Sequence, residues 1–178
     1  MTIETIASGI VEWAGVLGLG YVVNDAGDSV LIHTPGGETR WYLRAIDGEF
    51  FVGTGQRSAD EFFEVATATE EDVEKYLVSA VGPSLRAELL PQAPRVAPPV
   101  RSEDLAPEFT LEPANDGTTH GILLEGGKYR ARFSSFTTPM YAVRFSHYAN
   151  ASVEDIRASY VDEFGKPVFT VDVTQVSA

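Results

Sequence analysis

The chain has 178 residues, 44% of them apolar, and its 26 acidic side chains outnumber 13 basic ones. The apolar content excludes a disordered acidic tail, because such a tail lacks the apolar surface that offsets the entropy of ordering. The formal net charge of -13 repels phosphate backbones and argues against direct nucleic-acid binding. The same charge attracts basic protein surfaces and speeds their encounter with the chain.

The acidic excess lies mostly in the first half, where fifteen acidic and five basic residues precede Leu90. The chain has no cysteine, which excludes disulfides, thiolate nucleophiles and cysteine-ligated zinc. Its first residues lack the basic start of a signal peptide, and no apolar run approaches the roughly 20 residues of a membrane helix. We therefore expect a cytoplasmic protein that binds no membrane.

The first 90 residues predict a helix, a series of antiparallel strands and a second helix. Apolar residues at three- and four-residue steps predict a helix from about Thr2 to Leu17. Turn-forming segments then separate stretches of alternating polarity, with strands expected at 21–23, 29–33, 38–46, 50–52 and 60–67. The last of these is ambiguous between a strand and a helical turn. Thr69, followed by three acids, predicts the start of a helix that ends at Gly82-Pro83.

A proline-rich segment, residues 91–107, predicts an extended linker between an N-terminal lobe, 1–90, and a C-terminal lobe, 108–178. In the second lobe we expect strands at 109–111, 122–124, 129–134, 141–145 and 168–173, and a helix from Ser152 to Gly165. The order of strands, helix and glycine-proline stop thus occurs twice, which suggests a duplication. The predicted fold is α+β, with antiparallel sheets and a few packing helices in two similar lobes that join edge to edge or share one core.

Sequence motifs for catalysis are absent. His33, His120 and His147 lie in separate predicted strands or strand ends, without the short spacing of metal ligands. There is no G-x-S-x-G, G-x-x-x-x-G-K-[ST] or H-E-x-x-H motif. Gly53-Thr54-Gly55 resembles half of a nucleotide-binding loop, but the third glycine and the following helix start are missing. We expect no enzymatic activity, no cofactor and no metal site.

Aromatic and acidic side chains occur together in two segments of the first half. One is the turn at residues 47–49 with its flanking aromatic pairs, and the other is 60–64, where acids bracket two phenylalanines. Protein interfaces use aromatic anchors for buried area and charges to orient the partner, although for any single ring a place in the sheet core is the more common explanation. The candidate partner-binding residues are Trp41, Tyr42, Asp47, Glu49, Asp60, Glu61 and Glu64.

Five segments of the first half share glycine and aromatic spacings with a known family. They are Trp13-Ala14-Gly15, Gly20-Tyr21, Gly36-Gly37-Glu38-Thr39-Arg40-Trp41-Tyr42, Asp47-Gly48-Glu49-Phe50 and Gln56-Arg57. Together they resemble a family of actinobacterial immunity proteins from polymorphic-toxin systems, over residues 10–90. The resemblance implies a protein of the producer's cytosol that neutralises a secreted toxin which hydrolyses NAD at its glycosidic bond.

Charge and resemblance together predict an immunity protein that binds a cognate NAD-hydrolysing toxin domain and occludes its NAD-binding cleft. A cleft that binds NAD needs positive potential for the pyrophosphate, and an acidic protrusion competes for it. We expect a 1:1 complex and a monomer when free. The alternative is an acidic adaptor or nucleic-acid mimic that docks a basic partner. A third possibility is an enzyme or small-ligand carrier with a cavity between the lobes.

Overall fold

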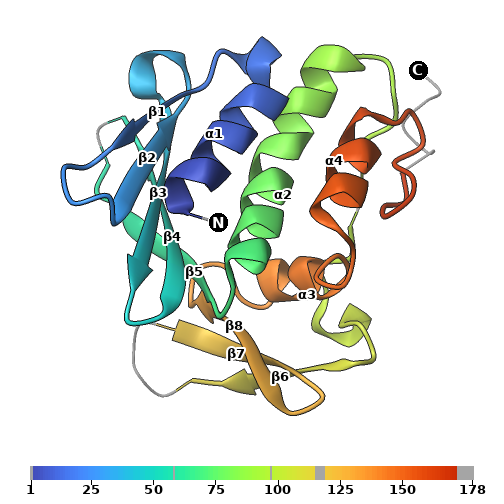
Figure 1. Ribbon diagram of the computed structural model, residues 1–178. Helices are drawn as coiled ribbons and strands as arrows, with labels where there is room; N and C mark the ends of the chain where they lie inside the picture. Colours follow the sequence, from blue (N-terminus) through green and yellow to red (C-terminus); the bar gives the residue numbers. More distant parts are fainter. Residues whose placement is uncertain (1, 58, 97, 115–118, 172–178) are drawn as a thin grey trace.

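The computed structural model describes residues 2–57, 59–96, 98–114 and 119–171, and its eight strands form one sheet (Figure 1). The strands are β1 (Gly20–Val23), β2 (Ser29–His33), β3 (Thr39–Ile46), β4 (Glu49–Gln56), β5 (Phe62–Thr67), β6 (Phe109–Pro113), β7 (Thr119–Glu125) and β8 (Lys128–Ser134). Their order in the sheet is β1-β2-β3-β4-β5-β8-β7-β6, and each neighbouring pair is antiparallel. The predicted α+β fold with antiparallel strands is confirmed.

Four α-helices accompany the sheet: α1 (Ile3–Trp13), α2 (Glu70–Leu89), α3 (Met140–Ser146) and α4 (Val153–Val161). Short 3-10 turns lie at η1 (Gly15–Leu17), η2 (Pro35–Gly37) and η3 (Ser102–Asp104). The side chains of Thr2, Thr69 and Ser152 accept a backbone hydrogen bond at the starts of α1, α2 and α4. Such caps satisfy amides that have no partner within the helix, so the predicted starts at Thr69 and Ser152 are confirmed.

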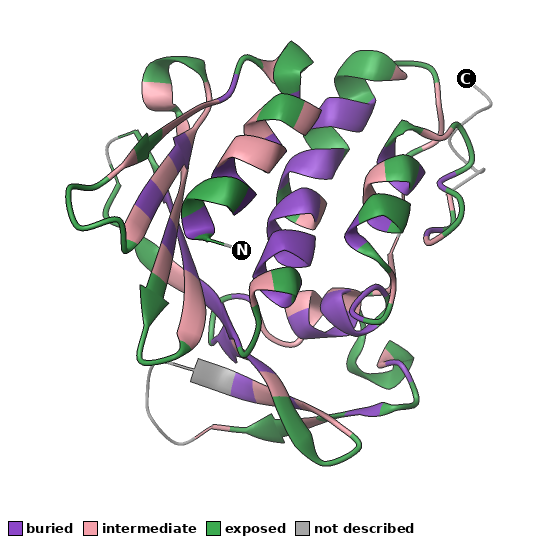
Figure 2. Cartoon of the chain, viewed as in Figure 1, coloured by how far each residue is buried: buried purple, intermediate pink, exposed green. Residues whose placement is uncertain are grey.

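The core lies between the helices and one face of the sheet, where the buried segments of α1, α2 and the central strands face one another (Figure 2). Alternation along the strands turns Val30, Leu43 and Val52 toward α1 and α2, and all three are fully buried. The same buried cluster includes Phe133 and Phe145 from the second half of the chain. Both halves therefore contribute to one core.

Strands β5 and β8 join the two halves edge to edge. Val65 pairs with Phe133 and Thr67 pairs with Ala131, so the sheet continues across the predicted lobe boundary. Within the predicted linker, Val96 makes an isolated bridge to a residue near the end of the described chain, Val171. The division into lobes 1–90 and 108–178 with a linker at 91–107 stays a prediction.

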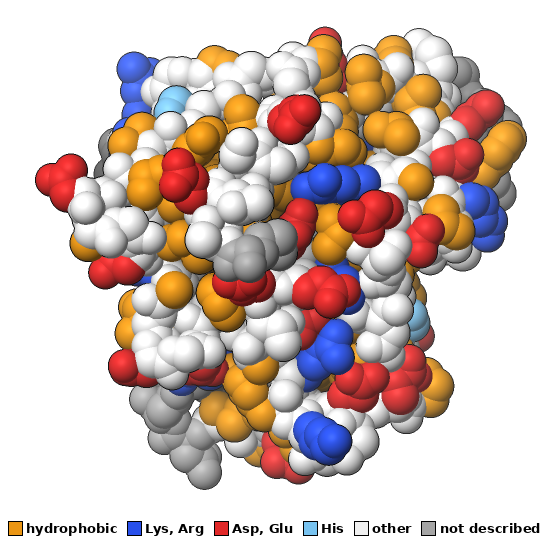
Figure 3. Space-filling model, viewed as in Figure 1, with side chains coloured by type: hydrophobic (Ala, Val, Ile, Leu, Met, Phe, Trp, Pro, Cys, Tyr) orange, Lys and Arg blue, Asp and Glu red, His pale blue; other side chains and the backbone are white. Residues whose placement is uncertain are grey.

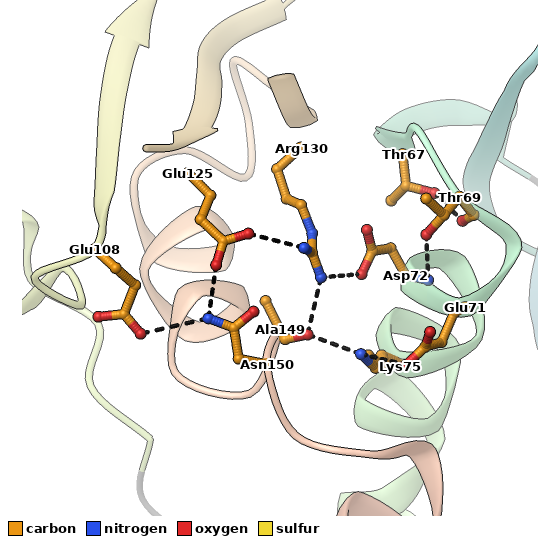
Figure 4. A network of polar contacts seen from close by, with 10 residues as sticks. All are labelled: Thr67, Thr69, Glu71, Asp72, Lys75, Glu108, Glu125, Arg130, Ala149 and Asn150. Carbon is orange, nitrogen blue, oxygen red and sulfur yellow. Dashed lines mark hydrogen bonds and ion pairs between the residues drawn. The ribbon is translucent and has the colours of Figure 1, made fainter. Parts of the chain in front are cut away.

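A polar network ties the start of α2 to β8 and to the loop after α3 (Figure 4). Arg130 pairs with Asp72 and Glu125, each at 2.8 Å, and donates a hydrogen bond to the carbonyl of Ala149 at 3.0 Å. Lys75 donates to the same carbonyl at 2.8 Å. Because Asp72 and Lys75 come from the first half and the other groups from the second, the network fixes α2 against the second half.

Two strand predictions in the second half need correction. Residues 141–145 form helix α3, whose buried face includes Ala142, Val143 and Phe145. A short apolar run has the same composition in a buried helix as in a strand, and periodicity does not separate the two. In 168–173, only Val171 has strand-type pairing among the described residues, and positions 172 and 173 lie outside them.

The predicted end of the second helix is also wrong, because α2 continues through Gly82 and Pro83 to Leu89. A Cβ at Gly82 would come within 2.3 Å of the Tyr160 ring, so glycine is needed where α4 packs closely against α2. Proline lacks the amide that would bond the carbonyl of Ser79, and this carbonyl accepts from the Tyr160 hydroxyl at 3.3 Å instead. Tertiary packing therefore explains both residues inside the helix.

Candidate partner-binding surface

The sheet face opposite the helices carries a layer of aromatic and charged side chains. Figure 1 shows α1, α2 and α4 on one side of strands β1–β5. Since Leu43 and Val52 point toward these helices, the alternate residues of the same strands point away from them. We define the uncovered face as the side chains of Tyr42, Arg44, Glu49, Phe51, Glu61, Phe63, Tyr129 and Arg132.

Rings and guanidinium groups pack together on the uncovered face. The ring centroids of Phe51 and Phe63 lie 6.1 Å apart, and the guanidinium of Arg132 lies 5.1 Å from the Phe51 centroid. Arg44 lies in the same way over Tyr42, at 5.5 Å. The rings of Tyr42, Phe51 and Phe63 are half-buried, and each contacts another ring or a guanidinium group. These contacts hold the rings in place while part of their apolar surface stays accessible.

Two ion pairs fix the charges on the uncovered face. Arg44 binds Glu61 with both guanidinium ends, with Nη2 2.6 Å from Oε2, and this hydrogen bonding raises the pKa of Arg44. Arg132 pairs with Glu49 at 2.8 Å, and Glu49 also accepts a hydrogen bond from the Tyr129 hydroxyl. The Glu61 side chain lies directly over Gly53. A Cβ at position 53 would come within 2.3 Å of the Glu61 carboxylate, so only glycine permits this arrangement.

The exposed acids Asp47 and Asp60 lie at opposite ends of strand β4. Asp47 occupies the β3–β4 turn with a φ of 51°, and Gly48 follows with a φ of 84°. Asp60 lies in the connection from β4 to β5. Because β4 has eight residues at a rise of about 3.3 Å each, roughly 25 Å separates the two ends. The two predicted segments, 47–49 and 60–64, therefore begin at opposite ends of one strand.

Trp41 and Glu64 lie on the helix side of the sheet, not on the uncovered face. Val52 pairs with Val65 and Gly53 with Phe63, so Glu64 is the extra residue of a β-bulge. The bulge directs its carboxyl group toward α2, where Thr54 and Tyr76 donate to it at 3.0 and 2.9 Å. Glu64 is only 7% exposed, and burial raises its pKa. With Trp41 it lines a cavity between the sheet, α2 and α3.

Acidic side chains are not gathered in one patch on the face seen in Figure 3, where they are spread over both the sheet and the helices. Their field therefore acts over the whole molecule, while the uncovered face balances Glu49 and Glu61 with two arginines. The long-range attraction to a basic partner and the local contact surface are thus separate features.

The described residues contain no group of three or more His, Cys, Asp or Glu side chains placed to hold a metal ion. His33 contacts the carbonyl of Thr34 at 3.1 Å through Nδ1, and His147 contacts that of Asp104 at 2.6 Å through Nε2. The side chain of His120 lies outside the described part of the structure. In that part, no helix has the length and apolarity needed to cross a membrane.

Local sequence patterns predict part of this surface. Of the candidate residues, Tyr42, Glu49 and Glu61 lie on the uncovered face. Strand alternation from Val52 would have added Phe51. Arg132 reaches the surface only through β5–β8 pairing, and no local pattern marks such a long-range contact. The role of the selected residues in binding stays a prediction.

Comparison with known proteins places this fold in a family. Residues 13–168 match the family described as Immunity protein 61. The chain belongs to the Immunity protein 61 family. The match runs from the end of α1 to just past α4, so it spans both halves of the sheet and is not limited to the first lobe.

Two curated relatives of this Immunity protein 61 member share 26% identity with it in an alignment 177 positions long, which covers 93% of each chain. They are described as an immunity factor for TNT, from Mycobacterium tuberculosis, and an immunity factor for TNT homolog, from Mycobacterium bovis BCG. A solved structure, described as Rv3902c from M. tuberculosis, superimposes with a TM-score of 0.78 at 26% identity. It covers 96% of this chain and 98% of that one.

Proposed function

We propose that this protein is an immunity protein that binds a secreted toxin and inhibits it without chemistry of its own. The observation that carries the proposal is the family match over residues 13–168, supported by relatives described as immunity factors for TNT over 93% of their length. The toxin of this proposal hydrolyses NAD, and the immunity protein occludes its NAD-binding cleft. It acts in the producer's cytoplasm, as a monomer that forms a 1:1 complex.

The proposed interface is centred on the uncovered face. Phe51, Phe63 and Tyr42 supply aromatic anchors in ordered positions, which lowers the entropy lost when a partner packs on them. Asp47 and Asp60, at the two ends of β4, contribute the charges that draw in a basic cleft rim. A stable interface of about 1,600 Å² in total spans both ends of the strand.

The net charge of -13 supports an electrostatic route to the toxin cleft. A cleft that binds the pyrophosphate of NAD presents positive potential, and opposite charges raise the association rate. The alternative, an acidic adaptor or nucleic-acid mimic, shares this charge but has no dependence on a toxin with an NAD cleft. A toxin partner therefore separates the two hypotheses.

The decisive experiment titrates NAD hydrolysis by the cognate toxin with this protein, and includes the protein alone as a control for intrinsic activity. Tight binding predicts that hydrolysis falls linearly and stops near an equimolar ratio. Phe51→Ala combined with Phe63→Ala should shift the endpoint to excess protein, since the dissociation rate rises when anchors are lost. Full toxin activity in the presence of excess folded protein would reject the immunity function.

A further inference from the structure

A cavity of about 340 Å³ lies between strands β3–β5, the middle of α2 and helix α3. Its volume lies within the range of roughly 300 to 1,000 Å³ that is typical of small-molecule sites. Side chains from both halves of the chain line it, including Trp41 and Glu64 from the first half and Tyr141 and Arg144 from the second. It lies on the opposite side of the sheet from the uncovered face.

Aromatic rings form much of the cavity wall. Trp41, Phe62, Tyr76 and Tyr141 line it, and the Tyr76 and Tyr141 centroids lie 6.3 Å apart. Phe62 is 42% exposed and contacts the ring of Phe136, which is 85% exposed, edge to face at 6.5 Å. The aromatic surface therefore continues from the cavity to the exterior, which gives a planar ligand both a matching wall and an entrance.

Arg144 supplies a cation to this cavity. Among the described residues it forms no ion pair, and its guanidinium carbon lies 5.8 Å from the centroid of the Tyr141 ring. Its Nε is buried without a hydrogen-bond partner, as are those of Arg130 and Arg157, so the missing ion pair is what distinguishes Arg144. Arg44 and Arg130, by contrast, each pair with a carboxylate. In a chain with twice as many acids as bases, an unpaired guanidinium at a cavity wall indicates an anionic ligand group.

Glu64 supplies a second polar contact. Thr54 and Tyr76 each donate to a different oxygen of its carboxyl group, and a carboxylate oxygen retains a further lone pair for another donor. The β-bulge places this acid at the cavity, where regular alternation would have placed it elsewhere. A ligand hydroxyl or N–H group is the chemical complement of this position.

We propose that the cavity binds a small aromatic acid, with its carboxylate on Arg144, its ring among Trp41, Tyr76 and Tyr141, and a hydroxyl or N–H donor on Glu64. A purely apolar compound would leave the guanidinium unpaired. A dinucleotide carries two phosphates and exceeds the volume. The site involves neither a toxin nor the uncovered face, so it is independent of the proposed inhibitory function.

The test is calorimetric titration of the full chain with 4-hydroxyphenylacetate, which carries the ring, the carboxylate and the donor. The uncharged amide, 4-hydroxyphenylacetamide, is the matched ligand control. Saturable 1:1 binding of the acid is expected, with the amide at least tenfold weaker, since it lacks the charge that pairs with Arg144. Equal affinity for the two compounds, or no saturable heat with the acid, would overturn the proposal with the wild-type protein alone.

Variants then locate the site. Arg144→Gln should weaken binding of the acid by about tenfold and abolish the preference for acid over amide. The substitution removes the positive charge through which the site distinguishes the two ligands. Arg101→Gln is the control, since Arg101 is exposed and lies in the segment before η3, outside the cavity lining. Near-ultraviolet circular dichroism checks that both variants keep wild-type packing. Undiminished, acid-selective binding by folded Arg144→Gln would contradict the assignment.

Discussion

Glu64 shows how one residue departs from the pattern of its segment. Its neighbours Phe62 and Glu61 are exposed, and by sequence it belongs to the same acidic run. The bulge in β5 turns its carboxyl group inward, where it is only 7% exposed and hydrogen-bonded to Thr54 and Tyr76. The penalty for burying the charged form exceeds the help from its two donors, and the pKa rises.

This raised pKa predicts how Glu64 affects stability as the pH changes. Between the ordinary value of 4.5 and the higher folded value, the native state holds more protons at this group than the unfolded state. The free energy of unfolding therefore falls as pH rises through that window. Relative to Glu64→Gln, which does not titrate, wild type should lose stability from acidic to neutral pH in denaturant titrations. A constant difference between the two proteins across that range would contradict this interpretation.

Arg130 is the residue on which the polar network of Figure 4 depends. Asp72 is 1% exposed, and within the described ranges of the chain its one ion pair is with Arg130. Removing the cation leaves a buried carboxylate unpaired, so Arg130→Met should lower the free energy of unfolding by about 3 kcal/mol. Urea denaturation measures the loss.

The matched control is Arg57→Met, which breaks an exposed pair with Glu38 and should change stability by at most about 0.5 kcal/mol. Similar losses of unfolding free energy in the two variants would mean that the burial of Asp72 does not determine how much Arg130→Met destabilises the protein.

Helix α2 illustrates packing at the scale of one element. Gly82 and Pro83 are typical helix-ending residues, yet the helix runs on to Leu89. Glycine is needed at position 82 because the Tyr160 ring of α4 occupies the space of a Cβ there. The missing bond at Ser79 is replaced by the Tyr160 hydroxyl, which also contacts the Ser79 hydroxyl at 3.0 Å. The requirement for glycine is thus imposed by a ring 78 positions away, and local propensity gives no sign of it.

Gly82→Ala should therefore destabilise the protein by about 2 kcal/mol, although alanine favours a helix by about 1 kcal/mol over glycine. The new methyl group would overlap the Tyr160 ring. Ala87→Gly, at an exposed position of the same helix, is the control and should lose about 1 kcal/mol from propensity alone. Thermal unfolding followed by circular dichroism compares the two, and a stabilised Gly82→Ala variant would show that α4 moves away without cost.

At the scale of the whole molecule, charge and contact surface act at different stages of binding. The net charge of -13 attracts a basic partner from a distance, whereas the uncovered face is locally balanced by two Arg–Glu pairs. Exposed acids beside the contact surface should therefore govern association, and the rings should govern dissociation.

Asp60→Lys is expected to slow association with the toxin about fivefold at low ionic strength and to weaken its salt dependence. Glu163→Lys makes the same change in net charge in the loop after α4, across the molecule from the sheet, and should have a smaller effect. Surface plasmon resonance at several salt concentrations measures both. Equal effects of the two substitutions would place the interface away from β4 and β5.

Local physics made much of this protein predictable from its sequence. Capping side chains at Thr69 and Ser152 and apolar alternation in β3 depend on near neighbours, so helix starts, antiparallel strands and the α+β class followed from them. Tyr42 and Glu61 could be predicted as partner-binding residues for the same reason, because aromatic and acidic groups lie close together in their segments. The acidic balance likewise depends on composition alone.

Only the tertiary structure decided how the two halves meet and which face each candidate occupies. The pairing of β5 with β8 brings Arg132 to Phe51, and the bulge in β5 sends Glu64 to the cavity with Arg144. Both outcomes depend on contacts between residues tens of positions apart, whose free energy is set by packing and register. A one-residue shift in register reverses the face of every side chain in a strand, and no local pattern records it.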